Sequence, residues 1–480
     1  MSSCTLGVGQ VAQHIKSREL SAEEYISQLF ERIEKVEPKV NALVTLNKEE
    51  ALNRARRLDK KIMDGEQCGL LAGVALSIKD NICTKGVKTT CSSKMLESYI
   101  PTYDATVIKR LIAAGAIIIG KANLDEFAMG STTEFSRHGP TRNPWDISRV
   151  SGGSSGGSAA SVATFECAAS LGSDTGGSVR CPASFCSVVG LKPTYGLVSR
   201  FGLVSYANSL EQIGPIGRTV SDVVSILNVI AGFDENDHTT TNSSKPTYSL
   251  QERKGLRVGL IREFTEGADP EVSRMIYNAA ETLKKEGCKC EEVSLPSVQY
   301  ALASYYTIAS AEASSNLARY DNVRYGFDMN PEGYEWNSYF ARARSNFGEE
   351  AKRRIIVGSY VLSSGYYGKY YLKAQQVRSL LRQEMETLFK NYDVLIGPTM
   401  PILPFKIGER IDDPLKMYLA DIDTVVANLT GMPAISVPAG FAEGLPVGLQ
   451  IIADQFAEQT IFDVAYLFEQ AAKVQRSSES

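Results

Sequence analysis

The sequence predicts an α/β fold in which helices cover a layered β-sheet. An amphipathic helix, a glycine and a short apolar strand follow one another at residues 105–120, and the pattern returns at 271–296 and 377–399. The 480 residues are 43% hydrophobic and 22% charged, which is typical of a globular protein with a large core. No proline-rich, acidic or low-complexity segment divides the chain, which favours a single domain.

The N-terminal residues 1–65 are expected to form packing helices without chemistry. Ser21 and Glu24 form a capping-box pattern, and apolar residues then recur at helical spacing. Pro38 is expected to lie just past the end of this helix. A second amphipathic stretch follows at residues 52–62.

Strands and helices alternate after the N-terminal helices. "GVALSIKDN" predicts a buried strand that ends in charge at Lys79, and "AIIIG" predicts a short, fully buried strand. We expect residues 66–240 to form the core and 241–480 the rest of the sheet. The polar segment 234–247 is the best candidate for a boundary. Similar elements lie on both sides of it, which favours a loop within one domain.

Charge, hydropathy and cysteine usage limit which functional classes are compatible with the sequence. The net charge of -4 gives no general reason to expect direct nucleic-acid binding, and no apolar run approaches the roughly 20 residues of a membrane span. The N-terminus lacks the basic start and apolar stretch of a signal peptide. Nine scattered cysteines and three histidines show no metal-ligand spacing. We expect a cytoplasmic protein with reduced thiols and no metal.

Two runs of glycine and serine carry the chemical information: "VSGGSSGGSAA" (150–160) and "GSDTGGSVR" (172–180). A flexible linker would have surface-like flanks, but the first run leads straight into small apolar residues. A phosphate-binding loop would carry a lysine after its glycines, and neither run does. The second run follows a strand-like segment and places Ser178 where backbone N–H groups converge. Ser178 is therefore a candidate nucleophile that needs a base.

Two residues could supply that base. His138 is the histidine nearest to the Gly/Ser segment and would allow a Ser-His-Asp triad. Lys79 ends an apolar run, and desolvation there would lower its pKa and make neutral lysine accessible. Alternatively, Lys79 is an ordinary strand-end lysine paired with Asp80. The residue pattern alone leaves these alternatives open.

Together these motifs resemble the amidase signature family, whose mark is the tract from "GGSSGGSAA" through "GSDTGGSVRCPA", preceded by a lysine in "IKDN". The resemblance implies one large domain over residues 1–480, with a mixed central β-sheet covered by α-helices on both faces. It also implies a Ser-cisSer-Lys triad. Ser178 would be the nucleophile, Ser154 the bridging serine after a non-proline cis peptide, and Lys79 the base. Backbone N–H groups would form the oxyanion hole, those of Thr175, Gly176 and Gly177.

Further segments, among them "GKANLDEFAMGSTTE" and "LTGMPAISVPAGF", resemble one branch of this family: the glutaminase subunits of tRNA-dependent amidotransferases. The resemblance implies a protein that releases ammonia from glutamine. A heterotrimer with subunits B and C would use that ammonia to convert misacylated Glu-tRNA(Gln), or Asp-tRNA(Asn), to the correct aminoacyl-tRNA. No cofactor is expected in this chain. ATP, Mg²⁺ and tRNA would be bound by the partner.

Glutamine needs partners for its α-carboxylate and α-ammonium, and the resemblance supplies them. Arg354 would bind the carboxylate in a charge-assisted contact, and Asp421 would bind the ammonium. Tyr305, Met129 and Gly130 would line the same pocket. Without the resemblance, these would be interpreted as surface or packing residues. The choice of Arg354 over its neighbour Arg353 also rests on it.

Four positions depart from the family pattern: Ala75, Ser77, Ser161 and Cys181. None is a proposed catalytic residue, and we expect them to affect packing around the triad. Cys181 is expected to be buried and inert. Two other functions stay open: a free-standing amidase for small carboxamides, and a catalytically silent scaffold protein. The charged pair in the pocket argues against an apolar substrate, and the complete triad argues against a silent scaffold.

Overall fold

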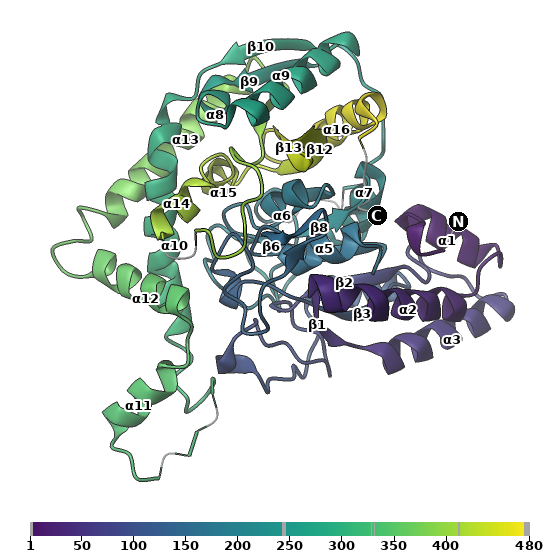
Figure 1. Cartoon of the computed structure of the whole chain (residues 1–480), viewed down its shortest axis with the longest axis horizontal. Coiled ribbons are helices and arrows are strands. Elements are labelled where there is room, and N and C mark those ends of the chain that lie inside the picture. Colours follow the sequence, from purple (N-terminus) through teal and green to yellow (C-terminus); the bar gives the residue numbers. More distant parts are fainter. Residues whose placement is uncertain (1–2, 242–245, 328, 331, 411–412, 475–480) are drawn as a thin grey trace.

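An 11-stranded mixed β-sheet forms the centre of the molecule (Figure 1). The computed structural model describes residues 3–241, 246–327, 329–330, 332–410 and 413–474. In the order of the sheet, the strands are β1 (Leu43–Leu46), β3 (Ile117–Ala122), β2 (Ala75–Lys79), β6 (Ala169–Asp174), β8 (Gln212–Gly217), β7 (Val189–Lys192), β12 (Ala434–Ala442), β13 (Leu445–Ile452), β11 (Val394–Pro398), β9 (Arg257–Ile261) and β10 (Lys289–Val293). A separate two-stranded sheet consists of β4 (Arg142–Asn143) and β5 (Asp146–Val150).

The pairing is parallel where β2 meets β3 and β6, and where β9 meets β10 and β11. The other neighbours in the large sheet are antiparallel. Strand β7 pairs with β12, so the large sheet continues across the segment at 234–247. The structure therefore has the predicted mixed sheet. The division of the chain into three parts stays a prediction.

Helices flank this sheet (Figure 1). The α-helices are α1 (Val8–Lys16), α2 (Ala22–Val40), α3 (Lys48–Met63), α4 (Thr106–Ala113), α5 (Gly156–Ala163), α6 (Arg180–Phe185), α7 (Val220–Ile230), α8 (Arg262–Glu266), α9 (Pro270–Lys285), α10 (Ala301–Leu317), α11 (Trp336–Arg344), α12 (Glu349–Leu362), α13 (Tyr371–Leu388), α14 (Pro414–Leu419), α15 (Val425–Thr430) and α16 (Glu458–Ala472). Short 3-10 helices are η1 (Ser3–Thr5), η2 (Lys94–Leu96), η3 (Glu126–Ala128) and η4 (Pro296–Tyr300).

Two large hydrophobic clusters and a smaller third one, around Val150, Phe185 and Met400, hold these elements together. The larger one lies between the sheet and helices such as α2, α4, α7, α9 and α16. The second cluster includes apolar residues of α10, α13 and α15, which pack on one another. In the described part of the chain, no helix combines the length and the hydropathy needed to cross a bilayer.

The start of α2 differs from the predicted capping box. The hydroxyl of Ser21 accepts a hydrogen bond from the Glu24 amide at 3.3 Å, as predicted. The Glu24 carboxylate, however, accepts from Gln28 one turn later instead of reaching back to the cap. Asp59 on α3 accepts from the first two helical amides at 2.7 and 3.0 Å. A carboxylate from another helix thus satisfies the first two helical amides, and the second half of the capping box does not form.

The end of α2 also corrects the sequence prediction. Pro38 lies inside the last turn of the helix, not past its end. A proline at this position removes one i→i−4 hydrogen bond, and its ring crowds the carbonyl of Glu34, so the helix ends soon after it. The helix ends at Asn41, whose left-handed φ of 56° lets its N–H bond to the Glu37 carbonyl at 2.9 Å.

The polar segment at 234–247 is tied to the core where it is described. Asp234 is buried and accepts hydrogen bonds from Thr106 of α4 and from Ser199. Residues 242–245 lie outside the described residues. The described residues 234–241 form a loop that hydrogen bonds tie to the core, as the sequence predicts.

The topology gathers the conspicuous motifs at one edge of the sheet. Strands β2 and β6 are parallel neighbours, so Lys79 and Asp174 end them at the same edge. Helix α5 begins at Gly156, two residues after Ser154, and α6 begins two residues after Ser178. Both Gly/Ser runs thus form turns that lead into helices beside the end of β2.

Candidate active site

Lys79 and Ser154 form a direct hydrogen bond in the protein interior. The lysine Nζ donates to the Ser154 Oγ at 2.8 Å, and both side chains are fully buried. The peptide bond between Gly153 and Ser154 is cis, as the resemblance implies. Lys79 also donates to the backbone oxygen and the hydroxyl of Ser173 at 3.2 and 3.0 Å. These contacts aim the amine at the bridging serine.

Ser178 lies on the loop that joins β6 to α6. The amide of Ser155 donates to the Ser178 carbonyl at 3.1 Å, which places the segment of Ser154 directly beside that of Ser178. Ser178 is 7% exposed, whereas Lys79 and Ser154 are inaccessible. The three residues predicted as a triad therefore come together. The one assigned as nucleophile is the one that a substrate can reach.

A buried ion pair holds the nucleophile loop. Arg180 donates to both oxygens of Asp174, at 3.0 and 2.9 Å, and both side chains are fully buried. Asp174 also accepts from the amides of Gly177 and Val179 at 2.9 and 3.2 Å. Burial raises the pKa of Asp174, but the charge and hydrogen bonds of Arg180 outweigh burial and lower that pKa overall. The loop around Ser178 is thus held from both ends.

Arg180 connects this loop to the C-terminal third of the chain. Its remaining N–H groups donate to the Thr424 carbonyl, Asn428 and Gln450 at 2.9, 2.7 and 2.6 Å. Together with the two bonds to Asp174, these contacts give each of the five N–H groups of the guanidinium an acceptor. Neither Arg180 nor Asp174 was assigned a role from the sequence, because an arginine after "GGSV" carries no signal of burial.

The predicted oxyanion donors differ in availability. The Gly177 amide donates to Asp174, whereas no acceptor in the described part of the chain takes the amides of Thr175 or Gly176. The glycines themselves are required here. A Cβ on Gly176 would lie 2.3 Å from the ring of Tyr305, and Gly177 has a φ of +126°. The oxyanion hole stays a prediction, with the first two amides available.

The surroundings of Lys79 favour a neutral amine. Burial lowers its pKa to about 7, and the negative charges of Asp125 and Asp174 only partly oppose this. The alternative pairing with Asp80 is wrong. Asp80 lies 3.7 Å from the buried Lys121, whose Nζ also donates to the Ile82 carbonyl at 2.6 Å. Lys121 is therefore the counter-ion of Asp80, and Lys79 donates its hydrogen bonds to Ser154 and Ser173 instead.

The histidine alternative lacks the necessary contacts. His138 is exposed, and its Nε2 lies 3.5 Å from the Thr90 hydroxyl. Within the described residues, no hydrogen bond joins His138 to Ser178. The geometry therefore favours the lysine route.

Arg354 is buried, and the rings of three tyrosines surround its guanidinium group. Its Nε donates to Glu350 at 2.7 Å, and its Nη1 donates to the hydroxyl of Tyr206. Its guanidinium carbon lies 5.4, 5.1 and 5.5 Å from the ring centres of Tyr206, Tyr306 and Tyr418. Although burial disfavours the charge, these neighbours raise the pKa of Arg354, so it is a permanent cation.

Arg353 points elsewhere. Its side chain is 38% exposed and pairs with the outer oxygen of Glu350. The Arg354 side chain is only 4% exposed, and no acceptor among the described residues takes a hydrogen bond from its Nη2. One donor of the inner arginine is thus left for a ligand, which agrees with the choice of Arg354 for the carboxylate.

Asp421 provides the opposite charge. One of its oxygens accepts from Ser131 and from the hydroxyl of Tyr306, both at 2.7 Å. No donor from the described residues reaches its other oxygen. Burial raises the pKa of Asp421 to about 6, although these two hydrogen bonds lower it. Asp421 is therefore ionised at neutral pH and has a free oxygen for a cation.

The other residues predicted to line the pocket lie near the nucleophile loop and near Asp125, and their contact with a substrate stays a prediction. Tyr305 is 3% exposed, and its ring lies against Gly176 in the nucleophile loop. Met129 is fully buried, and Gly130 next to it packs against the carboxyl of Asp125, where a Cβ would stand 2.4 Å away. Several contact residues of this pocket were not predicted from the sequence, namely Ser131, Tyr206, Tyr306, Glu350 and Tyr418.

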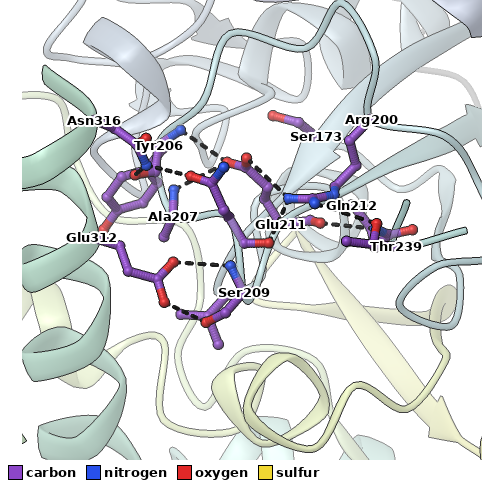
Figure 2. A network of polar contacts seen from close by, with 12 residues as sticks. Ser173, Arg200, Tyr206, Ala207, Ser209, Glu211, Gln212, Thr239, Glu312 and Asn316 are labelled. Carbon is purple, nitrogen blue, oxygen red and sulfur yellow. Dashed lines mark hydrogen bonds and ion pairs between the residues drawn. The ribbon is translucent and has the colours of Figure 1, made fainter. Parts of the chain in front are cut away.

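A polar network holds the turn that carries Tyr206 (Figure 2). Glu211 accepts from the amides of Tyr206 and Ala207 at 2.9 and 3.1 Å and lies 3.7 Å from Arg200. Glu312 on α10 accepts from the Ser209 amide at 2.9 Å. Fixing this turn fixes the tyrosine that bonds to Arg354.

The departures from the family pattern are accommodated in the core. The hydroxyls of Ser77 and Ser161 lie 3.0 Å apart, so two of the departures contact each other. Ser77 also donates to Ser170 at 2.8 Å. Cys181 is fully buried, as expected, and burial raises its pKa well above that of an ordinary thiol. Among the described residues, no cluster of three His, Cys, Asp or Glu side chains could hold a metal ion.

Comparison with known proteins gives consistent results. The family model described as Amidase matches residues 24–462. The A subunit of the glutamyl-tRNA(Gln) amidotransferase of Thermoanaerobacter pseudethanolicus is 53% identical over 477 residues, with 98% of each chain covered. The solved structure of the Thermotoga maritima protein of the same name has a TM-score of 0.83 and 40% identity, covering 100% of this chain and 99% of that one. A bacterial aryl acylamidase has a TM-score of 0.85 at 26% identity, covering 97% of this chain and 96% of that one.

Proposed function

The chain belongs to the amidase family, and from this premise we propose that it hydrolyses the side-chain amide of glutamine as the ammonia-releasing component of a tRNA-dependent amidotransferase. Relatives named for that enzyme share about half of its residues along nearly their whole length. Such similarity supports the role within an amidotransferase over that of a free-standing amidase.

One observation carries the substrate assignment: an arginine and an aspartate of opposite charge meet at one tyrosine. Tyr306 donates to Asp421, and its ring centre lies 5.1 Å from the guanidinium of Arg354. This pocket adjoins the loop of Ser178, because the Tyr305 ring packs on Gly176. An α-amino acid carries an ammonium and a carboxylate on the same carbon atom. Glutamine fits this description and presents an amide at the end of its side chain.

The proposed chemistry builds on the Lys79–Ser154 hydrogen bond and on the backbone contact that places Ser178 beside it. Neutral Lys79 takes the proton of Ser154 while Ser154 takes that of Ser178, and the Ser178 Oγ forms a bond to the amide carbon. Backbone amides at Thr175 and Gly176 stabilise the oxyanion. The C–N bond then breaks, and the proton on Lys79 returns to the departing nitrogen, which leaves as ammonia. Water hydrolyses the acyl group by the same relay and releases glutamate.

The rest of the reaction is assigned to partner subunits. We propose that subunits B and C complete a heterotrimer in the cytoplasm, and that the partner binds ATP, Mg²⁺ and the misacylated tRNA. The net charge of -4 supports this assignment, because it gives no general electrostatic basis for direct tRNA binding. Co-purification of two further subunits with the native protein would test it. Purification as a lone amidase with broad substrates would contradict it.

The catalytic test uses the assembled complex and Ser178→Ala. We expect the variant to lose ammonia release from glutamine by at least about 10³-fold, because the nucleophile is gone. Mass spectrometry should detect a glutamyl-enzyme in wild type at short times and none in the variant. The side chain shrinks by one atom, so the melting temperature should be unchanged. Near-normal turnover by Ser178→Ala would refute the proposed function.

A further inference from the structure

Asp125 is a buried carboxylate without a cation partner. It is fully inaccessible, and among the described residues no lysine or arginine forms an ion pair with it. In the described part of the chain its oxygens accept only from backbone amides: Thr132 and Thr133 at 3.3 and 2.9 Å, and Phe135 at 3.1 Å. Burying a charge is costly unless it is compensated, so a carboxylate held in this way calls for an explanation.

Its position connects two parts of the site. A Cβ on Gly153 would lie 2.2 Å from Asp125 Oδ2, so this oxygen packs directly on the residue before Ser154. A Cβ on Gly130 would lie 2.6 Å from the other oxygen. Gly130 precedes Ser131, which donates to Asp421. One carboxylate therefore contacts both the bridging-serine segment and the wall of the substrate pocket.

The other charges near Lys79 already have partners. Asp174 pairs with Arg180 at 2.9 Å, and Glu211 lies 3.7 Å from Arg200. The Cys91 thiol is buried, which raises its pKa well above the ordinary value and keeps it neutral. Asp80, next in the chain, faces Lys121. Asp125 is thus the carboxylate near Lys79 that has no ion-pair partner among the described residues. Burial raises its pKa to about 6, so it carries a charge near neutral pH, and that charge opposes the desolvation of the lysine.

From this placement we propose that Asp125 is a positioning residue of the triad. It holds in place the Gly153–Ser154 segment, whose serine bonds to Lys79 at 2.8 Å, and supplies a negative charge near Lys79 when the lysine carries the proton relayed from Ser178. The inference rests on the proposed function, because it concerns the same proton relay. It assigns a role to a residue that does not touch the substrate and contributes through its charge and its backbone contacts.

The sign of the expected pH effect follows from the charge. A negative neighbour favours the protonated lysine, so removing it lowers the pKa of Lys79 from its value of about 7. In Asp125→Asn, the acid limb of kcat/KM for glutamine should move to lower pH by about one unit. At the same time kcat should fall by about 10- to 100-fold, because the bridging serine is less well held. A merely structural role would lower stability and leave the limb in place.

Two further variants make the test decisive. Asp125→Ser keeps a hydroxyl for the backbone amides but also removes the charge, so it should shift the limb in the same direction. Asp234→Asn is the matched control. Its carboxylate is buried and ionised, with a pKa that burial raises but hydrogen bonds lower to about 2, and its partners are Thr106, Ser199 and Asn236, away from the triad. It should lower the melting temperature without moving the limb.

The outcomes separate this inference from the proposed function. An unshifted limb in Asp125→Asn or Asp125→Ser, with Ser178→Ala inactive in the same assay, would overturn the role of Asp125 alone. Full activity of Ser178→Ala would overturn the triad itself. A limb shift of equal size in Asp234→Asn would show that the effect is not specific to Asp125, which would also overturn its role.

Discussion

The triad region (Lys79, Ser154 and Ser178) and the recognition region (Met129, Gly130, Tyr305, Arg354 and Asp421) are built from different kinds of contact. In the triad region, small residues let backbone segments approach closely, and a serine hydroxyl meets a lysine amine at 2.8 Å. In the recognition region, Arg354 of α12 lies among aromatic side chains, including those of α10 and α14. Tyr306 and Tyr418, for example, stack with their centres 4.0 Å apart.

The two regions also differ in how they handle charge. The lysine of the triad region is desolvated until its pKa is about 7, so that it can lose and regain a proton. The arginine of the recognition region is surrounded by Glu350 and tyrosines that keep it charged. Burial thus serves proton transfer in one region and permanent charge in the other. The difference predicts that mutations in the triad region affect kcat, whereas those in the recognition region affect KM.

The largest effect is expected for Lys79→Met. Without the base, kcat should fall by about 10³-fold, while the dissociation constant of glutamine, measured by calorimetry, should change little. Lys192→Met is the control, because Lys192 is also fully buried with a pKa of about 7 but donates to a backbone carbonyl at Pro193. Lys192→Met should keep kcat. An equal loss of kcat in both variants would contradict a specific role of Lys79 as the base.

A smaller effect is expected for Glu350→Gln. Glu350 orients Arg354 through Nε and accepts from Tyr418 at 2.7 Å. The amide keeps the shape but loses the charge, so KM for glutamine should rise by about 10-fold with kcat nearly constant. Glu349→Gln on the same helix serves as the control. A fall in KM would mean instead that Glu350 competes with the substrate carboxylate for the arginine.

The same difference explains how far prediction from the sequence could go. A dense pattern of glycine and serine after a strand-end lysine encodes the triad region within one continuous part of the chain, from Lys79 to Ser178. The residue pattern pointed to Ser178 and left the base open between His138 and Lys79, and the resemblance carried by the motif then implied all three roles. The alternation of helices and strands predicted a layered sheet, and the resemblance added that the sheet is mixed.

The recognition region could be predicted only in part. Arg354 and Asp421 were placed by resemblance, but Tyr206, Tyr306 and Glu350 are ordinary residue types from distant segments, and only the fold brings them together. For the same reason, local rules failed at the start of α2, where a carboxylate from another helix replaces the capping partner. Asp125 was missed because an aspartate before a short helix suggests nothing more than a cap.

The most direct test of the separation between the two regions compares two substrates in Arg354→Ala and Arg353→Ala. Butyramide has an aliphatic amide but lacks both α charges. We predict that Arg354→Ala lowers kcat/KM for glutamine by about 100-fold and leaves the slow hydrolysis of butyramide unchanged, since only the carboxylate contact is lost. Arg353→Ala should change neither value. Loss of glutamine binding in Arg353→Ala alone, or an equal loss for both substrates in Arg354→Ala, would contradict the separation.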